Sequence, residues 1–320
     1  MLRYAADWRT LFFMFVFAAL SIGGWLFDPS GPLLVAWVMV TMISSWICAV
    51  IAHNTVHCPL FKQRWLNKAF QVWLSLSYGF PVSEYVPGHN LSHHKFTQER
   101  EDVMRTTKVN FRWNLLNFLF FFFAVGPGVT AGNYKYKKLM KQRLPAWNRQ
   151  LWYEIIAVWG VKAVLVALDW RKALCFVIIP HLFAVWGITT VNFLQHDGCD
   201  KDHKVNHSRN FVGAVFNWFT LNNGYHGIHH QTPGLHWSLT PQAHAEQYHP
   251  TIHPELEQKS LAVYMFKAFI YPGKRVTFDG KPVVVQNEGP DNDWVVATES
   301  TAAAELGAVG SGFASTSTAS

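Results

Sequence analysis

Nine histidines stand in three tight groups and one outlier, and their spacing predicts metal binding. The groups and the outlier read His53-Asn-Thr-Val-His57, His89-Asn-Leu-Ser-His93-His94, His226-Gly-Ile-His229-His230 and Asn192-Phe-Leu-Gln-His196. Imidazole is the commonest metal ligand in proteins, and residues three or four positions apart share one face of a helix. Because a structural zinc site closes with four ligands, nine imidazoles favour two metal ions. An imidazole-rich set suits iron, copper, nickel or zinc better than magnesium or calcium.

The composition of the 320-residue chain indicates a membrane protein. Half of its residues are hydrophobic, 16% are aromatic and only 15% are charged. Residues 11–27 and 33–52 carry no charge, and each approaches the roughly 20 residues of a membrane-spanning helix. The four cysteines are scattered without a C-x-x-C pair, so they indicate neither a disulfide framework nor a thiolate metal site.

Three apolar runs, residues 115–125, 155–168 and 173–194, separate the second histidine group from His196. If all three crossed the membrane, the two would face opposite sides and could not share a metal centre. The basic stretch 135–143 favours a cytoplasmic position, because positively charged loops stay on that side. We therefore predict that residues 115–125 form an interfacial or re-entrant element and that the later two runs cross, joined by residues 169–172. Every histidine group then lies on the cytoplasmic side.

Other segments have weaker signals. Residues 65–80 suit a helix lying in the membrane interface, although a buried core helix would look similar. From residue 286 onward Ala, Ser, Thr and Gly dominate, which predicts a catalytic domain over 1–285 and a disordered tail over 286–320. The chain has no phosphate-binding glycine loop, nucleophile elbow or nucleic-acid motif. Its net charge of +7 therefore favours anionic lipid headgroups and acidic partners, with no nucleic acid.

Together these motifs resemble the membrane fatty acid desaturase and hydroxylase superfamily. The boxes H-x-x-x-H, H-x-x-x-H-H and H-x-x-H-H occur in the expected order over roughly residues 10–270. The segment from Asn192 to His196 is similar to that of stearoyl-type desaturases, in which the histidine binds one iron and the asparagine reaches it through water. One departure concerns the second box, which is H-x-x-H-H in most desaturases, whereas the longer spacing is familiar from alkane hydroxylases.

The resemblance implies an all-α integral membrane protein, with four transmembrane helices, interfacial helices and a cytoplasmic helical cap that carries a di-iron centre. It implies an oxygen-dependent desaturase of fatty acyl chains, presented as a lipid or on an acyl carrier. The electron donor is then a separate protein such as ferredoxin or cytochrome b5. Carried over by position, one iron would be bound by His53, His57, His89, His94 and His230, and the other by His93, His196, His226 and His229, with Asn192 behind a water. No catalytic residue is expected apart from these ligands.

Two other classes of function remain open. A hydroxylase or ketolase acting on an alkyl, carotenoid or sterol substrate would use the same ligands. A metal-binding protein or transporter without catalytic activity would need polar residues along its spans, and these are nearly absent. Candidate partners for the free N–H groups of the ligands are Glu84, Glu101, Asp102, Asp197 and Asp200. The isolated histidines are expected to be polar residues at a wet boundary, namely His181, His203, His207, His236, His244, His249 and His253.

Overall fold

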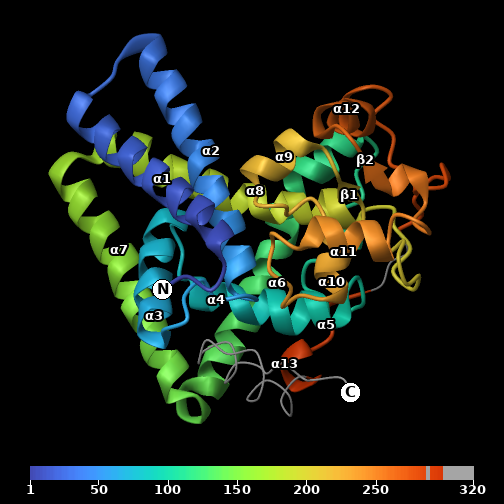
Figure 1. Ribbon diagram of the computed structural model, residues 1–320, viewed down its shortest axis with the longest axis horizontal. Coiled ribbons are helices and arrows are strands. Elements are labelled where there is room, and N and C mark those ends of the chain that lie inside the picture. Colours follow the sequence, from blue (N-terminus) through green and yellow to red (C-terminus); the bar gives the residue numbers. More distant parts are fainter. Residues whose placement is uncertain (286–288, 298–320) are drawn as a thin grey trace. The chain divides into compact units, whose positions relative to one another are not determined.

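The structure is a computed structural model, and it describes residues 1–285 and 289–297. These residues are largely helical, which confirms the all-α class (Figure 1). Their contacts define two compact units. The first comprises residues 1–86 and 137–188, and the second comprises residues 87–136 and the described part of 189–299.

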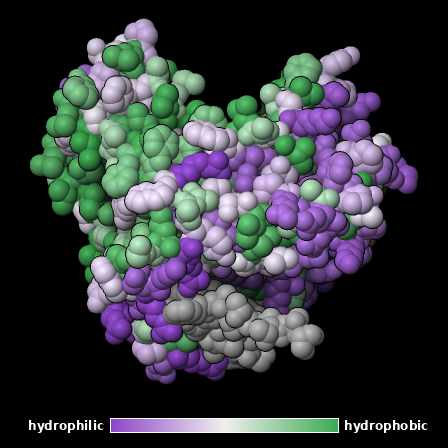
Figure 2. All heavy atoms as spheres, viewed as in Figure 1, coloured by the Kyte–Doolittle hydropathy of each residue, from purple (hydrophilic) through white to green (hydrophobic). Residues whose placement is uncertain are grey.

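Long apolar helices dominate the first unit. Its elements are α1 (Trp8–Phe27), α2 (Gly31–Thr55), α3 (Arg64–Tyr78), α4 (Val82–Val86), α7 (Pro145–Ala173) and the π-helical turn η4 (Leu174–Ile178). Large hydrophobic side chains are exposed on α1, α2 and α7, among them Phe15, Met39 and Ile156. Hydrophobic residues, green in Figure 2, cover much of the surface of this unit. An exposed apolar surface of this extent suits lipid rather than water. Four helical stretches, residues 5–27, 31–55, 114–143 and 145–196, are long and apolar enough to cross a membrane.

The turn predicted at residues 169–172 interrupts the last of these stretches. Asp169 leaves helical geometry at φ −158° and ψ 100°. Its carboxylate accepts hydrogen bonds from the backbone N–H groups of Arg171 and Lys172, at 3.0 and 3.1 Å, so it caps the helix that follows. Asp169 therefore divides residues 145–196 into two helices, of which the second runs through η4 into α8 (Ile179–His196).

The helix α3 has two unlike faces. Trp65 is 68% exposed, whereas Leu74 is 1% exposed. The buried face packs against α2 and α7 of the same unit. The segment is thus an amphipathic helix. Such a helix suits the membrane interface that the sequence predicted for residues 65–80.

The apolar run 115–125, which contains Phe120 to Phe123, lies in a longer helix than the sequence predicted. Instead of a short interfacial or re-entrant element, α6 (Asn114–Arg143) continues through Gly126-Pro-Gly128 with Pro127 inside. A proline within a helix costs about 3 kcal/mol, because it removes one hydrogen bond and crowds the preceding turn. Packing offsets this cost, since Phe121 is fully buried and its ring centroid lies 5.2 Å from that of Phe193. Tertiary contacts thus override the local breaker.

Short elements make up the rest of the second unit. After η2 (Pro87–His93) come α5 (His94–Phe96), η3 (Thr106–Lys108), β1 (Asn210–Phe211), α9 (Ala214–Phe219), α10 (His226–Gln231), α11 (Thr240–Gln247), η5 (Pro254–Leu256), β2 (Glu257–Gln258), α12 (Leu261–Met265), η6 (Phe266–Ile270) and α13 (Trp294–Ala297). The strands pair in parallel, with Asn210 opposite Glu257. The first unit likewise begins with a short 3-10 turn, η1 (Ala5–Asp7).

Part of the predicted disordered tail is folded. Residues 289–297 pack onto the second unit, where Trp294 and Val295 are each 2% exposed. Burial of a large aromatic side chain stabilises this short segment despite its polar neighbours. The remainder of the predicted tail, residues 286–288 and 298–320, lies outside the described residues.

Candidate metal centre

Four imidazoles converge within the second unit. The side chains are those of His93 in η2, His196 at the end of α8, and His226 and His230 in α10, and their ligating nitrogens all lie within 4.8 Å of one another. The Nε2 atom of His196 lies 2.9 Å from that of His226 and 3.1 Å from that of His230. His93, His196 and His226 are buried, with exposed fractions of 0 to 2%.

The outer ring nitrogens of two of these histidines are already bonded. His93 Nδ1 donates to Asp102 Oδ2 at 2.9 Å, and His196 Nδ1 donates to the carbonyl oxygen of His207 at 3.2 Å. In a neutral imidazole with Nδ1 protonated, Nε2 carries a lone pair. His93 Nε2 is buried without a hydrogen-bond partner among the described residues. Lone pairs that face one another in a buried space repel unless a cation lies between them, so this donor set fits a metal ion.

The electrostatics of the cluster favour neutral rings. Burial and the neighbouring imidazoles hold the pKa of His230 well below its usual value. Burial also lowers the pKa of His207 to about 4. Thr97 Oγ1 lies 3.3 Å from His230 Nδ1 and can accept a hydrogen bond from it. The Nε2 atom of His230 is then left to face the cluster. Neutral imidazole is the form that binds a metal.

A second group of imidazoles in the same unit comprises His89, His94 and His229. The Nε2 atom of His94 lies 3.1 Å from those of both His89 and His229. The rings of His89 and His229 are nearly parallel, with an interplanar angle of 15°. This trio repeats the convergence of nitrogen atoms seen in the first cluster.

The π-helical turn η2 explains how the long second box places its three histidines. In an α-helix, residues five positions apart point in different directions, whereas a π-helix brings positions i and i+5 together. His89 and His94 stand five apart and meet at 3.1 Å, while His93 points to the other cluster. The extra residue of H-x-x-x-H-H is thus accommodated by one wide turn.

The third box divides its histidines differently from the expected partition. His226 and His230 are four apart in α10, so they lie on one face and join His93 and His196. His229 points away from that face and joins His89 and His94. Relative to the partition that the resemblance implied, His229 and His230 exchange places, whereas the other five histidines of the second unit keep theirs.

The remaining predicted ligands lie in different settings. His53 and His57 belong to the first unit, at and just beyond the end of α2, with ring centroids 5.9 Å apart. His53 is buried, and its Nδ1 lies 3.2 Å from Asn54 Oδ1. In the second unit, Asn192 precedes His196 by one turn and donates from its side-chain amide to the carbonyl of Met104 at 3.0 Å.

One of the five candidate acids contacts a ligand directly, and it is Asp102. Asp197 pairs instead with Arg275, Glu84 with Lys137, and Asp200 with the backbone N–H of Asp202. Glu101 accepts from the amide of Asn292. Nearness in sequence was therefore a poor guide to which acid orients a histidine.

Sequence reasoning missed Thr97 and the backbone of His207. Thr97 follows the second box by one turn, and its hydroxyl also bonds back to the His93 carbonyl at 3.1 Å. His207 acts through its carbonyl, for which no side-chain pattern gives a signal. Three of the isolated histidines expected at a wet boundary are buried at 2 to 3% exposure, namely His181, His236 and His244. The ring of His181 lies 5.8 Å from that of Phe17, in the first unit, which is a packing contact.

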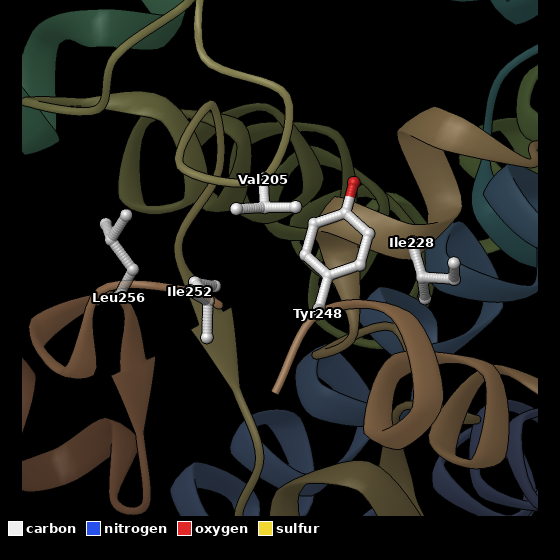
Figure 3. Packing of buried hydrophobic residues seen from close by; sticks show 5 residues of the cluster. All are labelled: Val205, Ile228, Tyr248, Ile252 and Leu256. Atoms are coloured by element: carbon white, nitrogen blue, oxygen red, sulfur yellow. The ribbon is translucent and has the colours of Figure 1, made fainter. Parts of the chain in front are cut away.

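A small hydrophobic cluster includes Ile228 of α10 and packs beside the third box. Figure 3 shows its members, Val205, Ile228, Tyr248, Ile252 and Leu256, with the Tyr248 ring between the others. The Tyr248 hydroxyl donates to the carbonyl of Gly227 at 2.9 Å and accepts from His207 Nε2 at 3.0 Å. Two hydrogen bonds therefore fix the hydroxyl end of this ring, one of them to the backbone of the third box.

A Gly227→Ala substitution is expected to destabilise the second unit. Its new Cβ would stand 2.6 Å from Cε1 of Tyr248, whose ring is fully buried and cannot move aside. Overpacking of this kind costs about 1–3 kcal/mol, which should lower the midpoint of thermal unfolding. Gly234→Ala is the matched control, because nothing lies within 4 Å of its Cβ position. Equal midpoints for the two variants would contradict the supporting role of Tyr248.

Comparison with known proteins agrees with this geometry. A sequence model of the family described as fatty acid desaturase matches residues 24–258, which covers most of the chain and all nine histidines. No curated protein matches the sequence. With its apolar helices and its buried histidine clusters, the chain belongs to the fatty acid desaturase family.

Proposed function

We propose that this protein is an oxygen-dependent iron enzyme that introduces a double bond into a fatty acyl chain. The observation that carries the proposal is the convergence of buried Nε2 atoms from His93, His196, His226 and His230 in a member of the desaturase family. Buried polar nitrogens cost free energy unless they are hydrogen-bonded or bind a metal ion. A metal-dependent reaction at the membrane accounts for both the buried imidazole cluster and the family of the chain.

The ligands proposed for two iron ions are all nine histidines. The second unit supplies seven of them, and the family resemblance assigns His53 and His57 to the iron held by His89, His94 and His229. Asn192 would reach the other iron through water. Iron bound here would supply the oxidising power to remove hydrogen from an unactivated methylene, which no amino-acid side chain provides.

The chain's own residues prepare the ligands for this role. Asp102 and the His207 carbonyl hold the Nδ1 protons of His93 and His196, so that the lone pairs of Nε2 face inward. The near-complete burial of His93 and His196 keeps bulk solvent away from these two ligands. A strongly oxidising site needs ligands that are oriented in advance and shielded from bulk solvent, because bulk water would compete with the substrate.

The proposed partners follow from what the chain lacks and where its helices lie. The sequence contains no haem, flavin or iron–sulfur motif, so a separate donor such as ferredoxin or cytochrome b5 would supply electrons. The acyl chain, as a lipid or on an acyl carrier, would enter from the bilayer. We place the histidines on the cytoplasmic side of the membrane, with the basic residues at the C-terminal end of α6.

Hydroxylation is the second candidate, because the H-x-x-x-H-H spacing is shared with alkane hydroxylases. A hydroxylase or ketolase of this family would act on an alkyl, carotenoid or sterol substrate with the same ligands. The wide turn η2 brings His89 and His94 together despite the extra residue, so the altered spacing alone does not favour either reaction. We favour desaturation because Asn192 and His196 follow the pattern of stearoyl-type desaturases.

The test is the lipid profile of a host that expresses the protein, analysed by mass spectrometry. A desaturase should yield acyl chains lighter by two hydrogens, which a host expressing the His93→Ala variant should lack. Products heavier by one oxygen would show that the enzyme is a hydroxylase. Identical profiles in both hosts, with the protein folded and loaded with iron, would count against catalysis of either kind.

A further inference from the structure

The described C-terminal segment, residues 289–297, packs onto the loop that follows the second histidine box. We name this segment the C-terminal latch. Trp294 of the latch stacks on Tyr136 of α6, with ring centroids 6.0 Å apart and an interplanar angle of 20°. Gly132 provides the space, because a Cβ there would lie 2.5 Å from Trp294 Nε1. The latch therefore occupies a site shaped for it within the second unit.

The latch supplies the negative charge for two buried cations. Asp291 pairs with Arg105 and, at 2.6 Å, with Lys108. The Arg105 side chain is 4% exposed and that of Lys108 is 11% exposed. Buried cations are costly unless a counter-charge accompanies them, and Asp291 contacts both. Without Asp291, neither cation is expected to stay in its present position.

Both cations lie on the loop that carries Asp102. The latch also bonds this loop on the other side of Asp102, since Asn292 donates from its backbone to the Arg100 carbonyl at 2.9 Å. Arg100 in turn donates to the Pro290 carbonyl at 3.0 Å. The latch thus holds the loop on both sides of the carboxylate that binds His93.

The loop transmits this restraint to the metal cluster by short bonds. Asp102 accepts from the backbone N–H groups of Gln98 and Met104, at 2.9 and 2.8 Å, as well as from His93. Ser92, next to His93, donates to the Glu101 carbonyl at 2.6 Å. A displacement of the loop would therefore move Asp102 relative to His93 Nδ1.

From these contacts we infer that the C-terminal latch holds the Asp102 carboxylate in place to accept the hydrogen bond from His93 Nδ1. Asp291 is then a positioning residue for the metal centre. The inference rests on the proposed iron site. Partners in the outer shell of a metal ligand fix its tautomer and ring direction, and their loss typically weakens metal affinity by about 10- to 100-fold. Asp291 would act one step further out, through the loop.

The experiment compares Asp291→Asn with Asp293→Asn in the full-length protein in detergent. Asp293 lies on the same latch, but it pairs with Lys135 at the surface, where the two side chains are 44% and 50% exposed. Such exposed pairs contribute little. Titration of the metal-free proteins with ferrous iron should show a loss of affinity of about tenfold for Asp291→Asn and near wild-type affinity for Asp293→Asn. Asp291→Glu, which keeps the charge, should restore most of the affinity.

Hydrogen–deuterium exchange of the metal-free proteins provides a second readout that needs no iron. Amides of residues 97–109 should exchange faster in Asp291→Asn than in Asp293→Asn. A chain ending at residue 288 should reproduce this effect, and one ending at residue 297 should not. Unchanged iron affinity and unchanged exchange in Asp291→Asn would overturn the inference. Failure of the wild-type protein to bind iron would instead overturn the proposed function.

Discussion

A His93→Ala variant is expected to lose turnover completely and to retain at most one of two irons per chain. The substitution removes a fully buried ligand atom from a cluster whose other members, His196, His226 and His230, converge on the same point. Three imidazoles would remain, and the carboxylate of Asp102 would lose its partner. Iron per chain, measured after purification from iron-replete cells, and product formation are the two measurements.

The control is His249→Ala. His249 is also a histidine that pairs with a carboxylate, that of Glu257, but its side chain is 69% exposed and belongs to neither cluster. This variant should keep two irons and most of the activity. Wild-type protein that contains a single zinc and is fully active would refute the di-iron proposal.

The identity of the clustered histidines was accessible from the sequence because their chemistry is local. Spacings of three and four residues recur on one helix face, and apolar runs beside them indicate a membrane setting. The assignment of His229 and His230 to the two clusters was not accessible. Both lie one turn after His226 on α10, and the spacing alone does not say which of them joins His93 and His196.

Two other features depended on contacts between distant segments. The sequence predicted a short element over residues 115–125, yet α6 continues through Gly126-Pro-Gly128, with Phe121 buried against Phe193. The polar composition after residue 286 predicted disorder. Trp294 nevertheless stacks on Tyr136, and Asp291 pairs with two cations of the second unit. Neither contact leaves a periodic signal in the chain, because each joins residues far apart in sequence.

The metal cluster constrains the membrane topology. His93 and His196 belong to one cluster, so the chain between them must cross the membrane an even number of times. Three apolar helices lie in this interval, namely α6, α7 and α8. Because Asp169 divides the stretch that contains α7 and α8, we propose that these two helices cross and that α6 does not.

Contacts at both ends of the first part of α6 support this topology. Asn114 begins the helix and donates to the carbonyl of Ala268 at 3.0 Å. Lys135 lies more than five turns further along the helix and pairs with Asp293. Both partners belong to the second unit, which carries the cluster. A helix fastened at both ends to the unit that carries the metal ligands is suited to lie along the membrane surface, with exposed Phe120 and Phe123 toward lipid.

Cysteine labelling in intact cells should therefore give an all-or-none pattern. In a background without reactive native cysteines, Lys138→Cys and Asp202→Cys should be shielded from an impermeant thiol reagent, because both positions would face the cytoplasm. Arg171→Cys, in the turn between α7 and α8, should be labelled and serves as the positive control. All three positions are exposed, so access would depend on the membrane and not on burial. Labelling of Lys138→Cys while Asp202→Cys stays shielded would show that α6 crosses, and the two histidines could then not share a metal ion.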